Sequence, residues 1–384
     1  MKLALVLPGG VDRGGEERVI PAFLALIGQL SQRHELHVFV LRQEPRPATW
    51  RLAGATIHNI GDGRQRTRAI AAILAEHRRA PFDAVQAIFS GTCSLVAITA
   101  AKLIGRPGLA HIAGGELIAL PAIGYGGRQR WISRVREAVT LRAAAAITAA
   151  SAPILDSLHA LGLDAQRLPL GVDLAAWQPS PPRRRGPGPA RLLHVASLNR
   201  VKDQPTLLRA LVELGDVPFQ MDIVGVDTLD GAMQRMAHDL GLDERVRFPG
   251  FKTQRELRPL MEAADLLVMS SLHEAGPLVL LEAAVAGVPT VGTAVGHLVE
   301  WSPVAALAVP VGDHLALAGA IRQVLHDEEL RLRLAHEAQR RALDEDAVYT
   351  AERFEALYRS LCRGTPSPRR GEGGGSRMRG RGSP

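Results

Sequence analysis

The sequence predicts an α/β protein of two domains, each built on a parallel β-sheet that helices cover on both faces. The chain has 384 residues, which is long for one domain and suits two. Aromatic residues make up only 4% of it, which favours α/β layers packed with small aliphatic side chains. Short apolar runs alternate with amphipathic helical stretches, which is the pattern of parallel strands buried on both faces.

In the first half of the chain, apolar runs of strand length recur at intervals. The predicted strands are Leu3–Leu7, Leu36–Leu41, Ala55–Ile60, Ala84–Phe89, Leu109–Ala113 and Ala146–Ala149. Helical periodicity predicts helices between them, among them Glu16–Arg33 and Arg66–Arg79. The alternation stops at Gln178–Pro189, where proline and glycine disfavour both helix and strand pairing, so we interpret this segment as a linker or an exposed loop.

The alternation restarts in the second half. The predicted strands are Leu192–Ala196, Met221–Gly225, Val246–Phe248, Leu266–Met269, Thr290–Gly292 and Ala306–Val309. We therefore predict an N-terminal domain over 1–176 and a C-terminal domain over 177–345, then a helix over 346–362 and a disordered tail over 363–384. That helix could pack back on the N-terminal domain, and it and the linker would permit the domains to close. One large sheet with a proline-rich excursion is the alternative.

Charge and cysteine content restrict the function classes. The chain carries +7, but its Gly/Arg-rich tail, Arg363 to Pro384, holds six arginines and one glutamate and so accounts for +5. The rest is close to neutral, and nucleic-acid binding is not expected. Two distant cysteines, Cys93 and Cys362, fit no disulfide or metal pattern and favour a cytoplasmic location. The first apolar run is too short for a signal peptide, and no stretch has the ~18 apolar residues of a membrane span.

A glycine-rich segment, Pro8 to Arg18, follows the first predicted strand and opens the first predicted helix. Glycines such as Gly14 and Gly15 let the backbone approach a ligand, and a helix N-terminus offers N–H groups to an anion. The spacing differs from that of dinucleotide-binding loops, and no acid ends the second strand, so a dinucleotide cofactor is disfavoured. A plain tight turn is the alternative.

Two cations, Arg200 and Lys202, follow the first strand of the second half. Ligands of open parallel sheets bind at the carboxyl ends of the strands, so these side chains are candidates for neutralising a diphosphate. The alternative is that both are solvated loop charges.

Two acids, Glu274 and Glu282, follow the strand Leu266–Met269. Glu274 lies in the loop, and a helix is predicted to begin near Pro277 and to end near Gly287. Glu282 lies within this otherwise apolar helix, where a carboxylate needs a polar partner. Sugar hydroxyls are suitable partners for both acids. The alternative is that Glu282 pairs with a neighbouring arginine and that Glu274 is a loop charge.

The segment Ser270–Pro289 resembles the E-x7-E motif of the retaining glycosyltransferases of family 4 (glycosyltransferase group 1), with Glu274 and Glu282 as its acids. Other segments are similar to the family's opening strand and glycine-rich loop, to the stretch before its interdomain linker and to two of its strands: 1–42, Leu170–Asp173, Val246–Phe251 and Ala264–Ser270. The resemblance covers most of residues 1–362 and is strongest over 190–300.

The resemblance implies the GT-B fold, in which two Rossmann-like domains hold parallel sheets that face each other across a cleft. It also implies a UDP- or GDP-linked sugar donor held by the C-terminal domain, with no bound metal or other cofactor. Glu274 would contact the donor sugar, Glu282 the ribose and Lys202 the leaving phosphate. Lys202 and Glu274 are the predicted catalytic pair. The further predicted donor-binding residues are Gly14, Gly15, Arg200, Gly250, Phe251, Gly276, Pro277, Leu278 and Glu282.

The roles that the resemblance implies agree with the chemistry of the reaction. Breaking a glycosidic bond to a diphosphate leaves charge on the phosphates, which a fixed cation and the backbone amides at Gly276–Leu278 would stabilise. Gly250 and Phe251 would border the base. One position departs from the family, which usually has an arginine where this chain has Ser197, and Arg200 is a substitute from the same loop.

The acceptor side departs further. The family often has a histidine at the end of the strand that is here Leu109–Ala113, where this chain has Ala113 or Gly114. His111 lies two residues earlier and is either an acceptor-side residue or an ordinary core histidine. Glu116, just beyond the strand, is the second acceptor-side candidate.

An amphipathic stretch over 127–139 carries an apolar stripe formed by Trp131, Ile132, Val135 and Val139, with arginines on its flanks. Core packing explains most such stripes, so we expect a helix that faces the core. The alternative is peripheral contact with an anionic membrane on its cytoplasmic face, where a lipid-linked acceptor would lie.

Together these features predict a glycosyltransferase that moves a hexose-type sugar to a glycan, lipid-linked or small-molecule acceptor in polysaccharide or cell-envelope assembly. Retention of configuration follows from the resemblance alone. Two alternatives are a nucleotide-sugar epimerase of the same fold and a non-catalytic sugar-nucleotide-binding protein. The joint presence of Lys202, Glu274 and Glu282 argues against the second.

Overall fold

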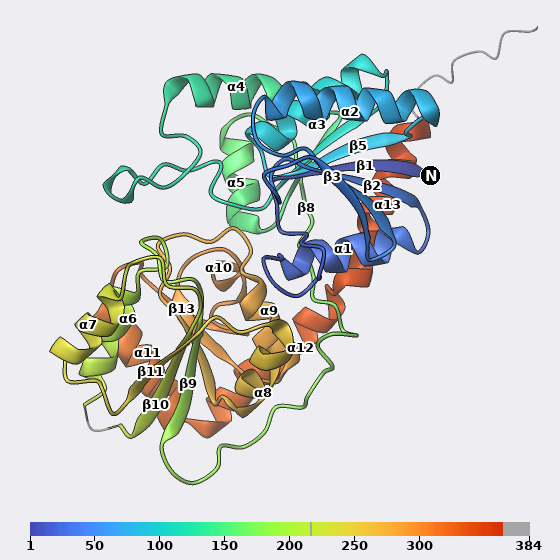
Figure 1. Ribbon diagram of the computed structural model, residues 1–384. Coiled ribbons are helices and arrows are strands. Elements are labelled where there is room, and N and C mark those ends of the chain that lie inside the picture. Colours follow the sequence, from blue (N-terminus) through green and yellow to red (C-terminus); the bar gives the residue numbers. More distant parts are fainter. Residues whose placement is uncertain (216, 364–384) are drawn as a thin grey trace, which may run out of the picture.

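The computed structural model describes residues 1–215 and 217–363 as two α/β domains, which a linker and the C-terminal helices connect (Figure 1). The predicted tail lies outside the described residues apart from Arg363. Among the described residues, two apolar clusters pack on the C-terminal sheet and three on the N-terminal sheet, and helices cover both faces of each. This is the layered α/β architecture that the alternating sequence pattern predicts.

Strands of the N-terminal sheet lie in the order β3-β4-β2-β1-β5-β6-β7-β8. Neighbours are parallel except for the β3–β4 pair, and the central strands are buried throughout. The elements in chain order are β1 (Lys2–Leu7), α1 (Pro21–Ser31), β2 (Glu35–Val40), β3 (Ala48–Leu52), β4 (Ala55–Asn59), α2 (Gln65–Arg79), β5 (Ala84–Ile88), α3 (Thr92–Leu103), β6 (Gly108–Ile112), the 3₁₀ turn η1 (Pro121–Ile123), α4 (Trp131–Arg142), β7 (Ala146–Ala149), α5 (Ala152–Ala160) and β8 (Gln166–Arg167).

Strands of the C-terminal sheet lie in the order β11-β10-β9-β12-β13-β14, and every pair among them is parallel. Parallel pairing requires crossovers, which the intervening helices supply. The elements are β9 (Ala190–Val195), α6 (Gln204–Glu213), β10 (Phe219–Val224), α7 (Ala232–Asp239), β11 (Val246–Gly250), α8 (Gln254–Ala263), β12 (Leu266–Met269), α9 (Leu278–Val285), β13 (Thr290–Thr293), α10 (His297–Trp301), β14 (Leu307–Val309), α11 (His314–His326), α12 (Glu328–Asp344) and α13 (Ala347–Arg363).

One predicted helix was wrong at its start. The structure begins α1 at Pro21, whereas the sequence predicted a helix from Glu16. Proline suits the first turn of a helix, and Arg18 before it has a positive φ of 50°, which a helix cannot accommodate. The glycine-rich segment is therefore a loop that runs to Ile20.

The last two helices return the chain to the first domain. α12 packs on the C-terminal core through Ala338 and Ala342, whereas α13 packs on the N-terminal core through Phe354 and Tyr358. The buried Tyr358 hydroxyl donates a hydrogen bond to Gln86 on β5. Figure 1 shows this exchange, with α13 in red lying beside α1 in blue.

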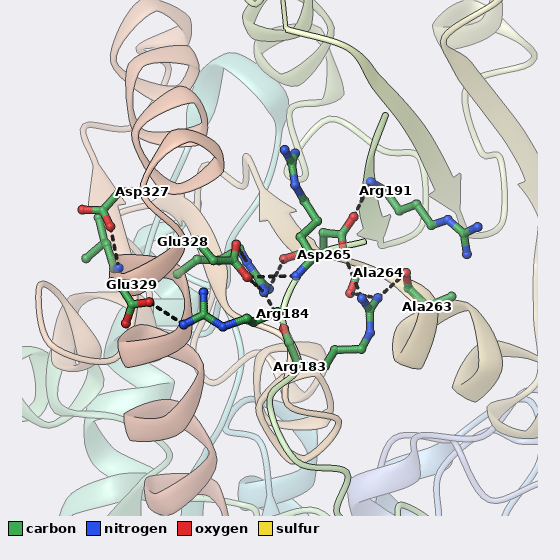
Figure 2. Close-up of polar contacts among 12 residues, drawn as sticks. Arg183, Arg184, Arg191, Ala263, Ala264, Asp265, Asp327, Glu328 and Glu329 are labelled. Carbon is green, nitrogen blue, oxygen red and sulfur yellow. Dashed lines mark hydrogen bonds and ion pairs between the residues drawn. The ribbon is translucent and has the colours of Figure 1, made fainter. Parts of the chain in front are cut away.

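The linker is bound to the C-terminal domain along part of its length. Figure 2 shows Arg183 reaching the end of α8, where its guanidinium donates to the carbonyls of Ala263 (2.8 Å) and Ala264 (3.2 Å) and pairs with Asp265 (3.2 Å). Arg184 pairs with Glu329 on α12 at 2.7 Å. The arginines of the linker are thus anchors rather than free loop charges.

A cluster of ionic contacts joins the two domains where β8 meets α10. Arg167 on β8 pairs with Glu300 of α10 (2.8 Å) and with Glu345 beyond α12 (2.6 Å). Glu300 also accepts a hydrogen bond from the backbone N–H of Ala152 at the start of α5. Burial alone would raise the pKa of Glu300, but the neighbouring His297 and the hydrogen bonds from Arg167 and Ala152 lower it to about 2. Glu300 is therefore ionised at neutral pH and links the domains.

Candidate functional site

The candidate site is a crevice between the domains at the carboxyl edge of the C-terminal sheet. A cavity of about 420 Å³ receives side chains from both domains. A second cavity of about 260 Å³ adjoins it, because both are lined by Val195, Ala196 and Leu278. The larger cavity is lined on the C-terminal side by Lys202, Ser271 and Glu274, among others, and on the N-terminal side by Ile20, Ala22, Phe23, Phe89, Ala113, Ala150 and Leu170.

Lys202 and Glu274 meet in the larger cavity. The Lys202 Nζ lies 2.5 Å from the Glu274 Oε1, and the Ser271 hydroxyl donates to the same oxygen at 2.6 Å. The Lys202 side chain is 24% exposed and the Glu274 side chain 12% exposed, so the pair can be reached from the crevice. The structure brings the predicted catalytic pair into direct contact across 72 residues of sequence.

The helix that follows Glu274 begins at the cavity wall. Gly276, Pro277 and Leu278 line the cavity where α9 starts. A Cβ on Gly276 would lie 3.3 Å from the Cβ of Ala150 in the N-terminal domain, so a residue without a side chain keeps this approach open. The unpaired N–H groups of the first turn make this end of α9 suitable for an anion.

Glu282 lies in the second cavity and has a partner that the sequence did not identify. Its Oε1 accepts a hydrogen bond from the Gln254 amide at 3.0 Å, and the Trp177 indole N–H donates to that amide's oxygen. Pairing with an arginine, the alternative considered from the sequence, was wrong. Burial raises the pKa of Glu282 to about 7, although the Gln254 hydrogen bond opposes this. The carboxyl therefore holds its proton more tightly than an exposed glutamate does.

The remaining wall of the second cavity suits a flat ring. Phe251 is 48% exposed and lines it together with Val226 and Thr253. Gly250 ends β11 with a φ of +74°, which turns the chain toward this wall, but Gly250 itself is not part of the lining.

Besides Gly250, three further predicted donor-binding residues lie outside both cavity linings: Gly14, Gly15 and Arg200. Gly14 is exposed, and Gly15 turns the loop with a φ of +70°. The N-terminal loop instead contributes Glu16 and Val19 to the second cavity. Arg200 is exposed and also lies outside the linings, so it does not take the place of the arginine that Ser197 replaces.

On the acceptor side the two predicted residues separate. His111 is fully buried within β6, where its Nδ1 lies 2.9 Å from the Thr148 hydroxyl, so it is a core histidine. Glu116 lies beyond the end of β6, outside both cavity linings, and accepts hydrogen bonds from the backbone N–H groups of Ser90 (3.0 Å) and Gly114 (2.7 Å). Burial raises the pKa of Glu116 to about 7.

Two polar side chains near Glu274 carried no recognisable signal in the sequence. Tyr125, from the loop after β6, packs against Gly115 and lies 6.2 Å from the His273 ring, measured between ring centres. Burial, together with the charges of Glu274 and Glu116, raises the pKa of Tyr125. The contact joins the N-terminal domain to the loop before α9. It could not be predicted from the sequence, because the two residues lie far apart along the chain.

The orientation of α4 corrects the expectation of a core-facing helix. Its stripe faces solvent, with Trp131 72%, Ile132 58%, Val135 54% and Val139 64% exposed. The helix buries the opposite side through Thr140 and Leu141, so the stripe is left uncovered.

Residues 180–341 match the family described as Glycosyl transferases group 1. The D-inositol 3-phosphate glycosyltransferase of Corynebacterium urealyticum is 33% identical over 178 residues, which are 44% of this chain and 42% of the relative. Sucrose-phosphate synthase from Thermosynechococcus elongatus has a similar structure, with a TM-score of 0.78, 19% identity and coverage of 94% of this chain and 98% of that chain. HepE of Anabaena in complex with UDP has a TM-score of 0.73, with 18% identity over 94% of this chain and all of that chain.

These likenesses and the topology confirm the predicted fold class: the chain has two Rossmann-like domains in the GT-B arrangement. The match to the family model lies within the C-terminal half of the chain, over residues 180–341. The chain spans less than half the length of the curated relative that it matches. Across residues 1–215 and 217–363, no helix has the length and apolar character needed to cross a bilayer.

Proposed function

We propose that this chain is a glycosyltransferase that transfers a sugar from a UDP- or GDP-linked donor to a hydroxyl-bearing acceptor, with retention of configuration. The observation that carries the proposal is the contact between Lys202 and Glu274 in a cavity that both domains line, where α9 begins. A cation, a hydrogen-bond acceptor and a helix N-terminus are the three groups that a sugar diphosphate requires. The UDP bound by the structurally similar HepE is in keeping with such a donor.

Each half of the donor has a matching part of the crevice. The diphosphate would lie against Lys202 and the first turn of α9, where positive charge stabilises the phosphate as it leaves. Glu274 would accept hydrogen bonds from sugar hydroxyls, and Glu282 from the ribose. The base would pack on Phe251, which is half exposed in the second cavity. Because Lys202 and the helix supply the positive charge, the proposal assigns no step to a metal or another cofactor.

The acceptor would enter from the N-terminal side, past Glu116 and Tyr125. We propose a glycan, a lipid-linked sugar or a small molecule as the acceptor class. We place the protein in the cytoplasm or on the inner face of the cell membrane. The polar side chains of Glu116 and Tyr125 could form hydrogen bonds with the hydroxyls of such an acceptor. The apolar side chains of Phe23 and Phe89, which line the larger cavity, would pack on a sugar face.

The test is calorimetry of the chain with UDP, GDP and ADP and with their hexose conjugates, with and without EDTA. We expect one nucleotide family to bind with a Kd in the micromolar range, unchanged by EDTA. Turnover of the binding conjugate with a simple glycoside, followed by NMR, should give a product with the anomeric configuration of the donor. An inverted product would contradict retention. Conversion of the donor without an acceptor would favour an epimerase, and binding without any turnover would favour a non-catalytic protein.

The exposed stripe of α4 supports contact between this domain and an anionic membrane. Four large apolar side chains lie uncovered, and Arg130, Arg134 and Arg142 are exposed beside them. The single acid of the helix, Glu137, is buried and accepts a hydrogen bond from Ser90 at 2.6 Å, so it does not weaken the positive face. Apolar side chains flanked by arginines are the composition of helices that lie in an anionic interface.

If the membrane contact forms, the protein should sediment with vesicles made of phosphatidylcholine and roughly 30% phosphatidylglycerol. The double variant Trp131→Ser, Val135→Ser should bind them about tenfold more weakly or worse, because each side chain contributes on the order of 1.5–3 kcal/mol when buried. Leu103→Ser, which removes an apolar side chain that is 62% exposed on α3, is the matched control and should bind like the wild type. Equal binding of the double variant would contradict the contact.

A further inference from the structure

We infer that Glu274 is a specificity-determining residue that selects the intact nucleotide-sugar over the free nucleoside diphosphate, because it competes with the diphosphate for Lys202. The inference rests on the proposed function of this site. The Lys202 Nζ lies 2.5 Å from the Glu274 Oε1. A diphosphate that takes this cation must therefore displace the carboxylate from it.

The two loops that carry the pair are fixed to each other, so the carboxylate cannot easily move away. The Leu272 N–H donates to the Val201 carbonyl at 2.8 Å, and the Ser270 hydroxyl donates to the Lys202 carbonyl at 2.8 Å. The Thr293 hydroxyl donates to the Ser271 carbonyl at 2.6 Å, which secures the loop from β13. Separation of the pair thus requires rotation of side chains rather than movement of a loop.

Little other positive charge is at hand to compensate Glu274. Among the described residues that line the larger cavity, Lys202 is the one lysine or arginine. Ser197 is uncharged, and Arg200 is not among the residues that line either cavity. When a diphosphate occupies Lys202, Glu274 keeps the Ser271 hydroxyl as its donor and lies beside a polyanion. Both the lost ion pair and the repulsion weaken the binding of a nucleotide that has no sugar.

An intact donor removes this penalty. Its sugar hydroxyls donate hydrogen bonds to Glu274 at the moment when the phosphates take Lys202, and hydrogen bonds to a charged group are among the stronger ones. After transfer the sugar is gone, Glu274 recaptures Lys202, and the nucleoside diphosphate is released. The same contact would therefore favour donor entry and product exit, with no change in the backbone.

The test compares the affinity of UDP and of GDP for the wild type and for Glu274→Gln by calorimetry. We expect the variant to bind the nucleotide that the wild type prefers roughly three- to tenfold more tightly, since an amide does not compete for the cation. Product inhibition should become stronger by the same factor, while the ratio of nucleotide-sugar to nucleotide affinity falls. Glu274→Ala, a second variant that removes the carboxylate, should also bind the nucleotide more tightly.

Two controls separate competition from a general change of charge. Glu17→Gln removes a negative charge from an exposed side chain of the same N-terminal loop that lies outside both cavity linings, and it should change the affinity less than about twofold. Ser271→Ala removes the other donor to Glu274, increases its dependence on Lys202 and should weaken nucleotide binding. Unchanged or weaker nucleotide binding in both Glu274 variants would overturn the inference. If neither UDP nor GDP binds the wild type, the proposed function itself fails, and the inference fails with it.

Discussion

Replacing Lys202 by methionine should reduce kcat/KM for the sugar donor by a factor on the order of 10²–10³, because the residue stabilises charge that develops as the phosphate leaves. It should also weaken nucleoside diphosphate binding by about tenfold or more, the usual cost of losing a hydrogen bond to a charged group. The loss has a simple structural reason: Lys202 is the cation placed in the larger cavity, 2.5 Å from Glu274 at the start of α9.

The matched control for this variant is Lys252→Met. Lys252 lines the second cavity beside Phe251, so its removal changes the net charge equally but leaves the start of α9 untouched. We expect it to alter base-side affinity by a few fold and to leave the chemical step unchanged. Steady-state kinetics and calorimetry on both variants would decide the matter. If Lys202→Met kept more than about a third of the wild-type kcat/KM, the lysine would have no part in the reaction.

The strands that are apolar along their whole length are the easiest to predict from the sequence. The run Leu266–Met269 coincides with β12, and every residue of it is buried. The antiparallel strand β3, Ala48–Leu52, was not predicted, because its side chains are half exposed and include Arg51. β8 has only two residues, too few to form a pattern. A strand that is buried on both faces is apolar throughout and can be recognised in the sequence. The edge strand β3 is partly exposed, so its sequence carries a weaker pattern.

The candidate site divides in a similar way. Lys202, Glu274 and Glu282 were recognised from their order along the chain, but their partners were not. Gln254 reaches Glu282 across 28 residues, and Trp177 reaches Gln254 across 77 residues. Only the packing of Trp177 and α8 on the same core brings them together. The periodicity of 127–139 identified an amphipathic helix but could not tell which side the domain leaves uncovered.

Replacing Arg331 by methionine should destabilise the C-terminal domain by about 2–4 kcal/mol, since it removes a buried guanidinium together with an ion pair and hydrogen bonds to two backbone carbonyls. The side chain is 2% exposed on α12 and pairs with Glu328 at 2.7 Å. It also donates to the Asp265 carbonyl at 3.3 Å and to the Arg183 carbonyl. Figure 2 shows Glu328, Asp265 and the linker residue Arg183, which are the partners named here. Thermal unfolding should begin several degrees lower in the variant.

Arg340→Met is the matched control, because Arg340 lies on the same helix and pairs with Glu337 and Asp344 but is 59% exposed. Exposed pairs contribute ~1 kcal/mol or less, so this variant should unfold close to the wild type. An equal loss of stability in the two variants would show that burial is not what makes Arg331 matter.

The difference between wild type and Arg331→Met should also depend on pH. The Arg331 hydrogen bond, with help from the Arg185 N–H, lowers the pKa of Glu328 to about 2. An unfolded glutamate has a pKa of about 4.3, so the folded state binds this proton less tightly than the unfolded state does. The ion pair therefore stabilises the domain fully above about pH 4.3, and its contribution is lost as the pH falls toward about 2. Urea unfolding at pH 7 and at pH 3 should show a smaller difference between the two proteins at the lower pH. Because Arg331 joins α12 to the linker and to the start of β12, the same loss would free the linker from the domain that it positions against the crevice.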